Sequence, residues 1–212
     1  MSKYMNHARD PISSLTHLIG AGLSVAGTIA LLVVSLRTVE NRALTLTSSL
    51  IFGFSMLALY SASAFYHYYK GSEKAIKILR KVDHSMIYVL IAGTYTPILL
   101  LGVGGREGII FTMVIWAIAF SGIAIKLCWI NAPRWLYTGV YLLMGWAIVF
   151  YYPALLALDP LTLGLVAAGG IAYTIGAVMY IFKKPNFLKS FGFHEIFHIF
   201  IMLGSAFHFL AV

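Results

Sequence analysis

Two histidines stand four positions apart near the end of the chain, at His194 and His198, and Glu195 directly follows the first of them. On an α-helix, residues at this spacing lie one above the other on the same face, so both imidazoles could bind one metal ion. In metalloproteases this HExxH pattern binds zinc through the histidines, and the glutamate is the general base. Here the pattern lies in a segment apolar enough to cross a membrane, where ionisable groups are rare and usually mark an ion or substrate site.

The composition of the chain is that of a protein with several membrane spans. Sixty per cent of its 212 residues are apolar and 10% are charged, against roughly 25% charged in an average soluble domain. The single cysteine, Cys128, excludes an internal disulfide and a thiolate-rich zinc site, so any metal must rest on His and carboxylate ligands. The formal charge of +8 is spread over short loops, which favours membrane lipids as partners and argues against nucleic acid.

Apolar runs of about 20 residues, the length that crosses the hydrocarbon core of a bilayer, occur seven times. They lie at Leu15–Leu36, Leu44–Tyr66, Val82–Leu101, Ile109–Trp129, Leu136–Leu156, Leu161–Phe182 and Phe193–Leu210. We therefore predict an all-α integral membrane protein, a single seven-transmembrane helix bundle over residues 1–212 in the plasma membrane. The chain leaves no room for a separate soluble domain.

The lysines and arginines between these runs predict the orientation of the bundle. One side carries twelve of them: Lys3, Arg9, Lys70, Lys74, Lys77, Arg80, Lys81, Lys126, Arg134, Lys183, Lys184 and Lys189. The other side carries three: Arg37, Arg42 and Arg106. Because short loops rich in Lys and Arg stay in the cytoplasm, the N-terminus is expected inside and the C-terminus outside.

This topology brings further polar residues to the cytoplasmic ends of the spans. His67 ends the second span, and Asp83 and His84 begin the third, at the same face as His194 and His198. Three histidines from two helices, with water as the fourth ligand, make an open zinc site. Asp83 could then orient or deprotonate the water, although a carboxylate in the first turn of a helix is also favoured by the helix dipole.

Other polar residues near this face have weaker assignments. Ser63 lies one turn before the histidine that ends the second span, where it could hydrogen-bond to a ligand or to the water. His84 could be a ligand, a proton shuttle or a neighbour of the basic loop. Structural roles are expected for His7, His17 and His208. His208 follows His194 by 14 residues, or about 21 Å along a helix, and is expected near the outer surface.

The protease interpretation of the HExxH pattern weakens on closer inspection. Intramembrane proteases of the site-two type carry a further Asp on a later helix, in a segment like Asn-Pro-Asp-Gly. Only 14 residues follow His198, and none of them forms such a segment. A third ligand must therefore come from upstream, where His67 can supply it.

Three blocks of the chain resemble the signature blocks of the hemolysin III family, the bacterial branch of the superfamily that includes the adiponectin and progestin receptors. They are Ser63–His67, Leu79–Ser85 running into Ala92–Pro97, and His194–His198. The resemblance covers essentially the whole chain. It implies a zinc ion near the cytoplasmic face with His67, His194 and His198 as ligands, Asp83 as the water-holding residue and Ser63 as the motif serine.

The resemblance also carries an expectation of function. Members of the superfamily resemble zinc-dependent amide hydrolases that act on ceramide-like lipids, and the bacterial branch is named for hemolysis and linked to membrane lipid homeostasis. We therefore expect a hydrolase of lipid amides or esters that uses zinc as a Lewis acid, with Glu195 in a supporting role only. Two alternatives stay open: a pore-forming cytolysin, and a sensor or receptor-like membrane protein with structural zinc.

Overall fold

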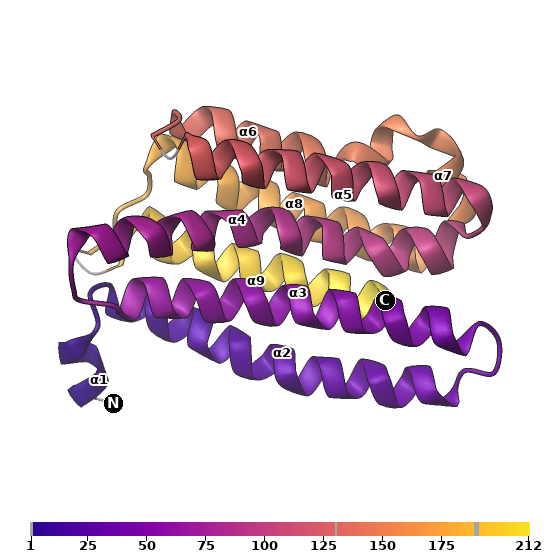
Figure 1. Cartoon of the computed structure of the whole chain (residues 1–212), viewed down its shortest axis with the longest axis horizontal. Helices are drawn as coiled ribbons and strands as arrows, with labels where there is room; N and C mark the ends of the chain where they lie inside the picture. Colours follow the sequence, from indigo (N-terminus) through magenta and orange to yellow (C-terminus); the bar gives the residue numbers. More distant parts are fainter. Residues whose placement is uncertain (1, 130, 189–190) are drawn as a thin grey trace.

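The computed structural model describes residues 2–129, 131–188 and 191–212, and in these residues the fold is a bundle of helices without a strand (Figure 1). The elements are α1 (Ser2–His7), α2 (Pro11–Arg37), α3 (Arg42–Tyr68), α4 (Glu73–Pro97), the π-helical turn η1 (Ile98–Val103), α5 (Gly105–Cys128), α6 (Arg134–Gly145), the 3₁₀ turn η2 (Ala147–Phe150), α7 (Tyr152–Ala157), α8 (Pro160–Phe182) and α9 (Phe193–Ala211). Consecutive long helices from α2 to α5 pack side by side, α8 packs against α6 and α9, and α9 returns to α2. The first and last spans are therefore neighbours.

Within the described residues, six helices are long and apolar enough to cross a membrane: Pro11–Arg37, Arg42–Tyr68, Glu73–Val103, Gly105–Cys128, Pro160–Phe182 and Phe193–Ala211. Large apolar side chains on their outer faces are exposed, among them Leu23, Phe54 and Phe120. Many serines and threonines are instead buried, and half of these bond to a carbonyl one turn back, as Ser24 does to Gly20. An apolar outside around a polar inside suits a lipid environment.

The predicted fifth span is not one continuous helix, so the count of seven spans is not confirmed. Residues 134–157 form three short pieces, α6, η2 and α7, which together run along the bundle from one end to the other (Figure 1). The break begins at Gly145, and Pro153 near the start of α7 has no N–H to continue a helix. The Tyr95 hydroxyl of α4 satisfies the interrupted backbone, since it donates to the Gly145 carbonyl (2.8 Å) and accepts from the Ile148 amide (3.1 Å).

Close contact between α8 and α9 sets the position of the last helix. A Cβ on Gly204 would lie 2.3 Å from the Tyr173 ring, and a Cβ on Gly169 would lie 2.3 Å from the His208 ring. Each helix therefore packs a ring against a glycine of the other, which brings the two backbones close together. Because α9 is held in this way along its length, its first turn has a defined place at the end of the bundle.

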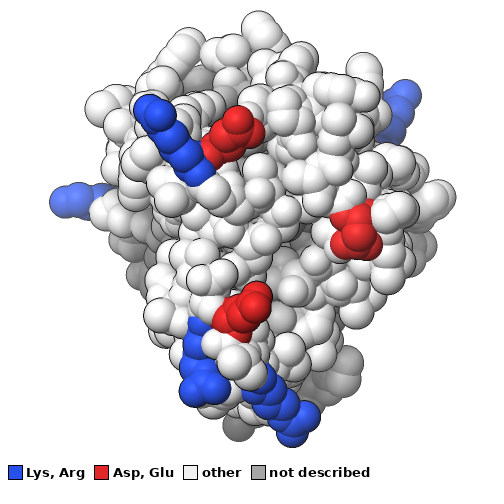
Figure 2. Space-filling model, turned by 90° about the vertical axis from the view of Figure 1, so that its right-hand side faces the viewer, with Lys and Arg blue, Asp and Glu red and all other residues white. Residues whose placement is uncertain are grey.

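The two ends of the bundle differ in charge. The end formed by the α2–α3 connection, the start of α5 and the start of α8 holds Arg37, Arg42 and Arg106 against Glu40, Glu107 and Asp159. Figure 2 shows this end, where acidic and basic side chains are scattered among uncharged ones. Its three positive and three negative groups cancel, so the net charge of +8 belongs to the opposite end. Lys189, which the charge count of the sequence includes, lies outside the described residues.

Candidate metal centre

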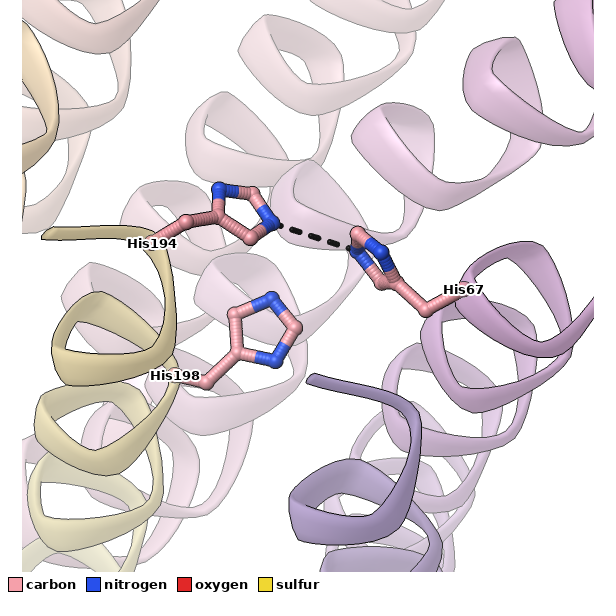
Figure 3. A group of neighbouring side chains, drawn as sticks. All are labelled: His67, His194 and His198. Carbon is pink, nitrogen blue, oxygen red and sulfur yellow. Dashed lines mark hydrogen bonds between the residues drawn. The ribbon is translucent and has the colours of Figure 1, made fainter. Parts of the chain in front are cut away.

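Three histidines from two helices meet at the basic end of the bundle. His67 lies on the last turn of α3, and His194 and His198 lie on the first two turns of α9. One ring nitrogen from each residue can be chosen so that all three lie within 4.8 Å of one another. Figure 3 shows the rings of His67 and His194 pointing toward each other from these helices, with His198 beside them. The histidines predicted from spacing and topology are therefore brought together.

The distance between two of the rings suits a tetrahedral metal ion. The Nε2 atoms of His67 and His194 are 3.3 Å apart. Zinc–nitrogen bonds of 2.0–2.1 Å in tetrahedral geometry put two ligand nitrogens about 3.3 Å apart, so this pair already has the spacing of two ligands. The His67 and His198 rings have centroids 5.0 Å apart and lie nearly perpendicular to each other, which leaves space between the three imidazoles.

A carboxylate just before α2 orients His67. The Asp10 Oδ2 atom lies 2.9 Å from His67 Nδ1 and 3.0 Å from Arg9 Nε. Burial by itself raises the pKa of the Asp10 carboxyl, but its hydrogen bonds to His67 and Arg9 outweigh burial and hold the pKa at about 2, below the ordinary 3.8. The carboxylate is thus ionised at neutral pH and accepts the Nδ1 proton, which leaves His67 Nε2 as a bare metal ligand.

Asp10 was missed by the sequence analysis. Its place directly before Pro11 is a common signal for the start of a helix, and nothing local distinguishes it from an ordinary N-cap. In the structure the Asp10 side chain makes no capping bond to α2. The Asp10 amide donates to the His67 carbonyl at 2.9 Å, so backbone and side chain together hold this residue against the end of α3.

Removing the Asp10 carboxylate is expected to weaken zinc binding without abolishing it. Outer carboxylates that orient a metal-binding histidine contribute about 10- to 100-fold in metal affinity, so Asp10→Ala should raise the dissociation constant for zinc by that factor. The measurement is a competition titration of purified protein with a fluorescent zinc chelator. Glu73→Ala, at an exposed carboxylate in the first turn of α4, is the matched control and should change nothing; equal affinity in the Asp10→Ala variant would contradict the assignment.

The other buried ligand, His198, is held from α2. Its Nδ1 donates to the Ser13 carbonyl at 3.2 Å, which leaves Nε2 free to face the other histidines. The His17 ring stacks on the His198 ring with centroids 3.7 Å apart and an angle of 12°. Both His17 ring nitrogens are buried and have no hydrogen-bond partner among the described residues. His17, predicted to be structural, thus packs directly against a ligand of the candidate centre.

Glu195 is occupied by structural hydrogen bonds. One carboxylate oxygen accepts from the Ser13 hydroxyl at 2.8 Å, and the other accepts from the Gly192 amide at 2.8 Å. The second bond is the glutamate half of a capping box, which closes the first turn of α9. A general base needs a free oxygen directed at the reacting water, so this geometry favours a supporting role for Glu195 over the role it has in proteases.

A cavity of about 600 Å³ opens beside the three histidines and extends into the bundle. Ser63, Asp83 and His84 line the same cavity as the histidine cluster. The Asp83 carboxylate lies 3.5 Å from His84 Nδ1, and its side chain is 13% exposed. His84 Nδ1 also donates to the Arg80 carbonyl at 2.7 Å, so this nitrogen is engaged within its own helix. The residues predicted to surround the metal therefore share one space with its candidate ligands.

His208 lies on the last turn of α9, at the opposite end of this helix from His194, in keeping with the spacing of 14 residues. It is 7% exposed and lines the inner part of the cavity. Its Nδ1 donates to the Gly204 carbonyl at 2.8 Å, and its ring stacks on Tyr173. The space that Gly169 leaves for the His208 ring explains the burial, and this packing between distant segments has no signature in the local sequence.

Comparison with known proteins extends over nearly the whole chain. A family model described as haemolysin-III related matches residues 5–209. The Hemolysin-3 homolog of Bacillus subtilis (strain 168) is 38% identical over 201 residues, which cover 94% of this chain and 91% of that protein. Hemolysin-3 of Bacillus cereus is 33% identical over 222 residues, which cover all of this chain and 94% of that protein.

Proposed function

The chain belongs to the haemolysin-III-related family, and from this premise we propose that it is a zinc-dependent hydrolase of lipid amide or ester bonds in the cell membrane. The observation that carries the proposal is the position of His67, His194 and His198 in the wall of a cavity that is large and mostly apolar. Three protein ligands leave one coordination position open for water or substrate, as in catalytic zinc sites. A cavity of this size falls within the range of small-molecule binding sites.

The proposed topology has seven crossings, with the three pieces α6, η2 and α7 together making the fifth. Non-helical backbone is tolerated at membrane depth where protein groups satisfy it, and the Tyr95 hydroxyl does this at the break. The surplus of Lys and Arg at the end that holds the three histidines supports a cytoplasmic location for this end. The N-terminus would then be cytoplasmic, the C-terminus would lie outside, and the candidate metal centre would be at the inner face.

The residues around the histidines have separate roles in this proposal. Zinc bound there would supply a Lewis acid that lowers the pKa of a bound water. Asp83 holds the attacking water, accepts its proton and passes it to the leaving nitrogen or oxygen. Ser63, which is 2% exposed in the cavity wall, hydrogen-bonds to the water or to the lipid carbonyl. The apolar wall takes up the hydrocarbon chain and restricts the entry of bulk water.

Turnover of lipid by the purified protein tests the proposal. We expect the protein to hydrolyse a labelled ceramide or lysophospholipid, a chelator to reduce the rate at least about 100-fold because the Lewis acid is lost, and added zinc to restore it. Mass spectrometry of the released fatty acid gives the rate, and Cys128→Ser, which removes the only thiol that a chelator or metal could involve, is the control. Turnover that is insensitive to the chelator would contradict a zinc hydrolase.

A non-catalytic sensor with structural zinc is the second candidate, because a metal bound by His67 and His194 would tie α3 to α9. This reading predicts zinc in the purified protein, a higher melting temperature with zinc than without it, and no turnover of any lipid. A pore-forming protein, which the name hemolysin of the two relatives suggests, would instead release dye from vesicles. Measurements of lipid turnover and of dye release from vesicles therefore separate these two alternatives from the enzyme.

A further inference from the structure

A lysine without an anionic partner is buried in the wall of the cavity. Lys126, on the last turn of α5, is 3% exposed. Its ammonium lies 3.6 Å from the centroid of the Tyr137 ring, a cation–π contact. Among the described residues, no carboxylate lies within ion-pair distance of Lys126. A buried ammonium is costly unless an anion or several acceptors compensate it. Asp83 interacts electrostatically with Lys126 but lies beyond ion-pair distance, so an anionic ligand beside the ammonium would compensate its charge more closely.

Other cations line the same end of the cavity, namely Arg80, Arg134 and Lys183. Arg134 donates one hydrogen bond to the Tyr180 carbonyl (3.0 Å), and its guanidinium stacks on the Tyr180 ring at 4.3 Å. An arginine carries five N–H donors, so Arg134 is held in place with most of its donors unused. The acidic residue that lines this cavity is Asp83. The four cations outnumber this single carboxylate, so this part of the cavity wall carries a net positive charge.

Short contacts connect this basic group to the candidate metal centre. The Lys126 ammonium lies over the Tyr137 ring. The Tyr137 hydroxyl lies 3.3 Å from the Tyr180 hydroxyl. The Tyr180 ring in turn lies 5.7 Å, centroid to centroid, from the His194 ring. Two tyrosines therefore separate the buried ammonium from a candidate zinc ligand. A ligand bound at the cations would reach the histidines.

The rest of the cavity wall is mostly apolar, although a few polar side chains such as Thr94 and His208 also line it. Beyond the basic end it is lined by Leu90, Ile91, Ile98, Val166 and Ile201, together with aromatic rings. A cationic entrance that leads into an apolar interior matches the two parts of an amphiphile: a negative headgroup and a hydrocarbon chain. Several cations in one part of the cavity wall favour phosphate over a carboxylate, because phosphate carries more charge and more acceptor oxygens.

We propose that Lys126 and Arg134 bind the phosphate-bearing headgroup of an anionic membrane lipid whose hydrocarbon chain enters the cavity. The binding claim stands without hydrolysis; that the bound lipid is the substrate rests on the proposed function. The site selects lipids with a phosphate headgroup over neutral lipids of the same chain length, and anionic phospholipids are therefore the substrate class of the proposed hydrolase.

Binding of two matched lipids to the purified full-length protein tests this site. Lysophosphatidic acid and monoacylglycerol with the same acyl chain differ only in the phosphate. We expect wild type to bind the anionic lipid at least about tenfold more tightly, since charge-assisted hydrogen bonds differ from neutral ones by that factor or more. Lys126→Gln should lose this preference, Lys126→Arg should keep it, and Lys77→Gln, at an exposed lysine outside the cavity, should match wild type.

Equal affinity of wild type for the two lipids would overturn the proposal, and so would an unchanged preference in Lys126→Gln. A Lys126→Gln protein that fails to fold is recognised by its melting curve, and Arg134→Gln then carries the same test. Inorganic phosphate is the third probe: if it displaces the lipid at low millimolar concentration, free phosphate is the ligand and the lipid assignment fails. The preference should persist in His194→Ala, so that loss of zinc or turnover is distinguished from loss of headgroup binding.

Discussion

Replacing His194 with alanine is expected to reduce the zinc content of the purified protein from about one ion per chain to less than about 0.1. The His194 Nε2 atom lies 3.3 Å from His67 Nε2, which is the spacing of two ligands on one tetrahedral zinc ion. Two neutral imidazoles that remain from a three-ligand set bind zinc far more weakly, because each lost ligand removes a bond that the protein does not replace. Inductively coupled plasma mass spectrometry after dialysis gives the metal content.

Glu195→Gln is the matched control for this experiment. It changes the next residue of the same helical turn, and glutamine can still accept a hydrogen bond from the Gly192 amide or the Ser13 hydroxyl. We expect this variant to retain its zinc and most of its stability. Full zinc content in His194→Ala would remove the basis of the metal assignment, whereas loss of zinc in Glu195→Gln would show that the glutamate is a ligand.

Asp83→Asn is expected to lower lipid turnover by about 100- to 10,000-fold, the usual contribution of a general acid or base, while zinc stays bound. Asp83 lines the cavity beside the three histidines but is not one of the residues whose ligand atoms lie within 4.8 Å of one another. An asparagine of the same shape keeps the packing and removes the group that accepts and returns a proton. Steady-state release of fatty acid and metal content are measured on the same preparation.

Two comparisons make the Asp83 result specific. Ser63→Ala, which removes a hydroxyl that only hydrogen-bonds, should cost less in turnover than Asp83→Asn. Glu107→Gln, at the opposite end of the bundle, should leave turnover at the wild-type level. Turnover within a few-fold of wild type in Asp83→Asn would exclude Asp83 as the proton carrier, and loss of zinc in this variant would make it a ligand instead.

Several features of the molecule follow from local patterns in the chain. The i, i+4 spacing of His194 and His198 places both on one helical face, and the structure confirms that they share a site. Six of the seven predicted spans are long apolar helices, since the length of an apolar run and the thickness of a bilayer are sufficient to identify them. His67 could be predicted because alternating spans bring every second helix end to the same face. The orientation of these ends relative to the membrane stays a prediction.

The sequence by itself therefore determined the class of protein, the helices and the histidines of the candidate centre, because these depend on composition, run length and spacing along one chain. Only the tertiary structure decided that Asp10 orients His67 and that Glu195 caps α9. It also decided that the predicted fifth span is broken at the point where the Tyr95 hydroxyl hydrogen-bonds to its backbone. The tertiary structure likewise decided that Lys126 is buried with no carboxylate of the described residues within ion-pair distance. Each of these facts depends on contacts between segments far apart in the chain, and the same residue types would fit a cap, a continuous span or a solvated loop if those contacts were absent.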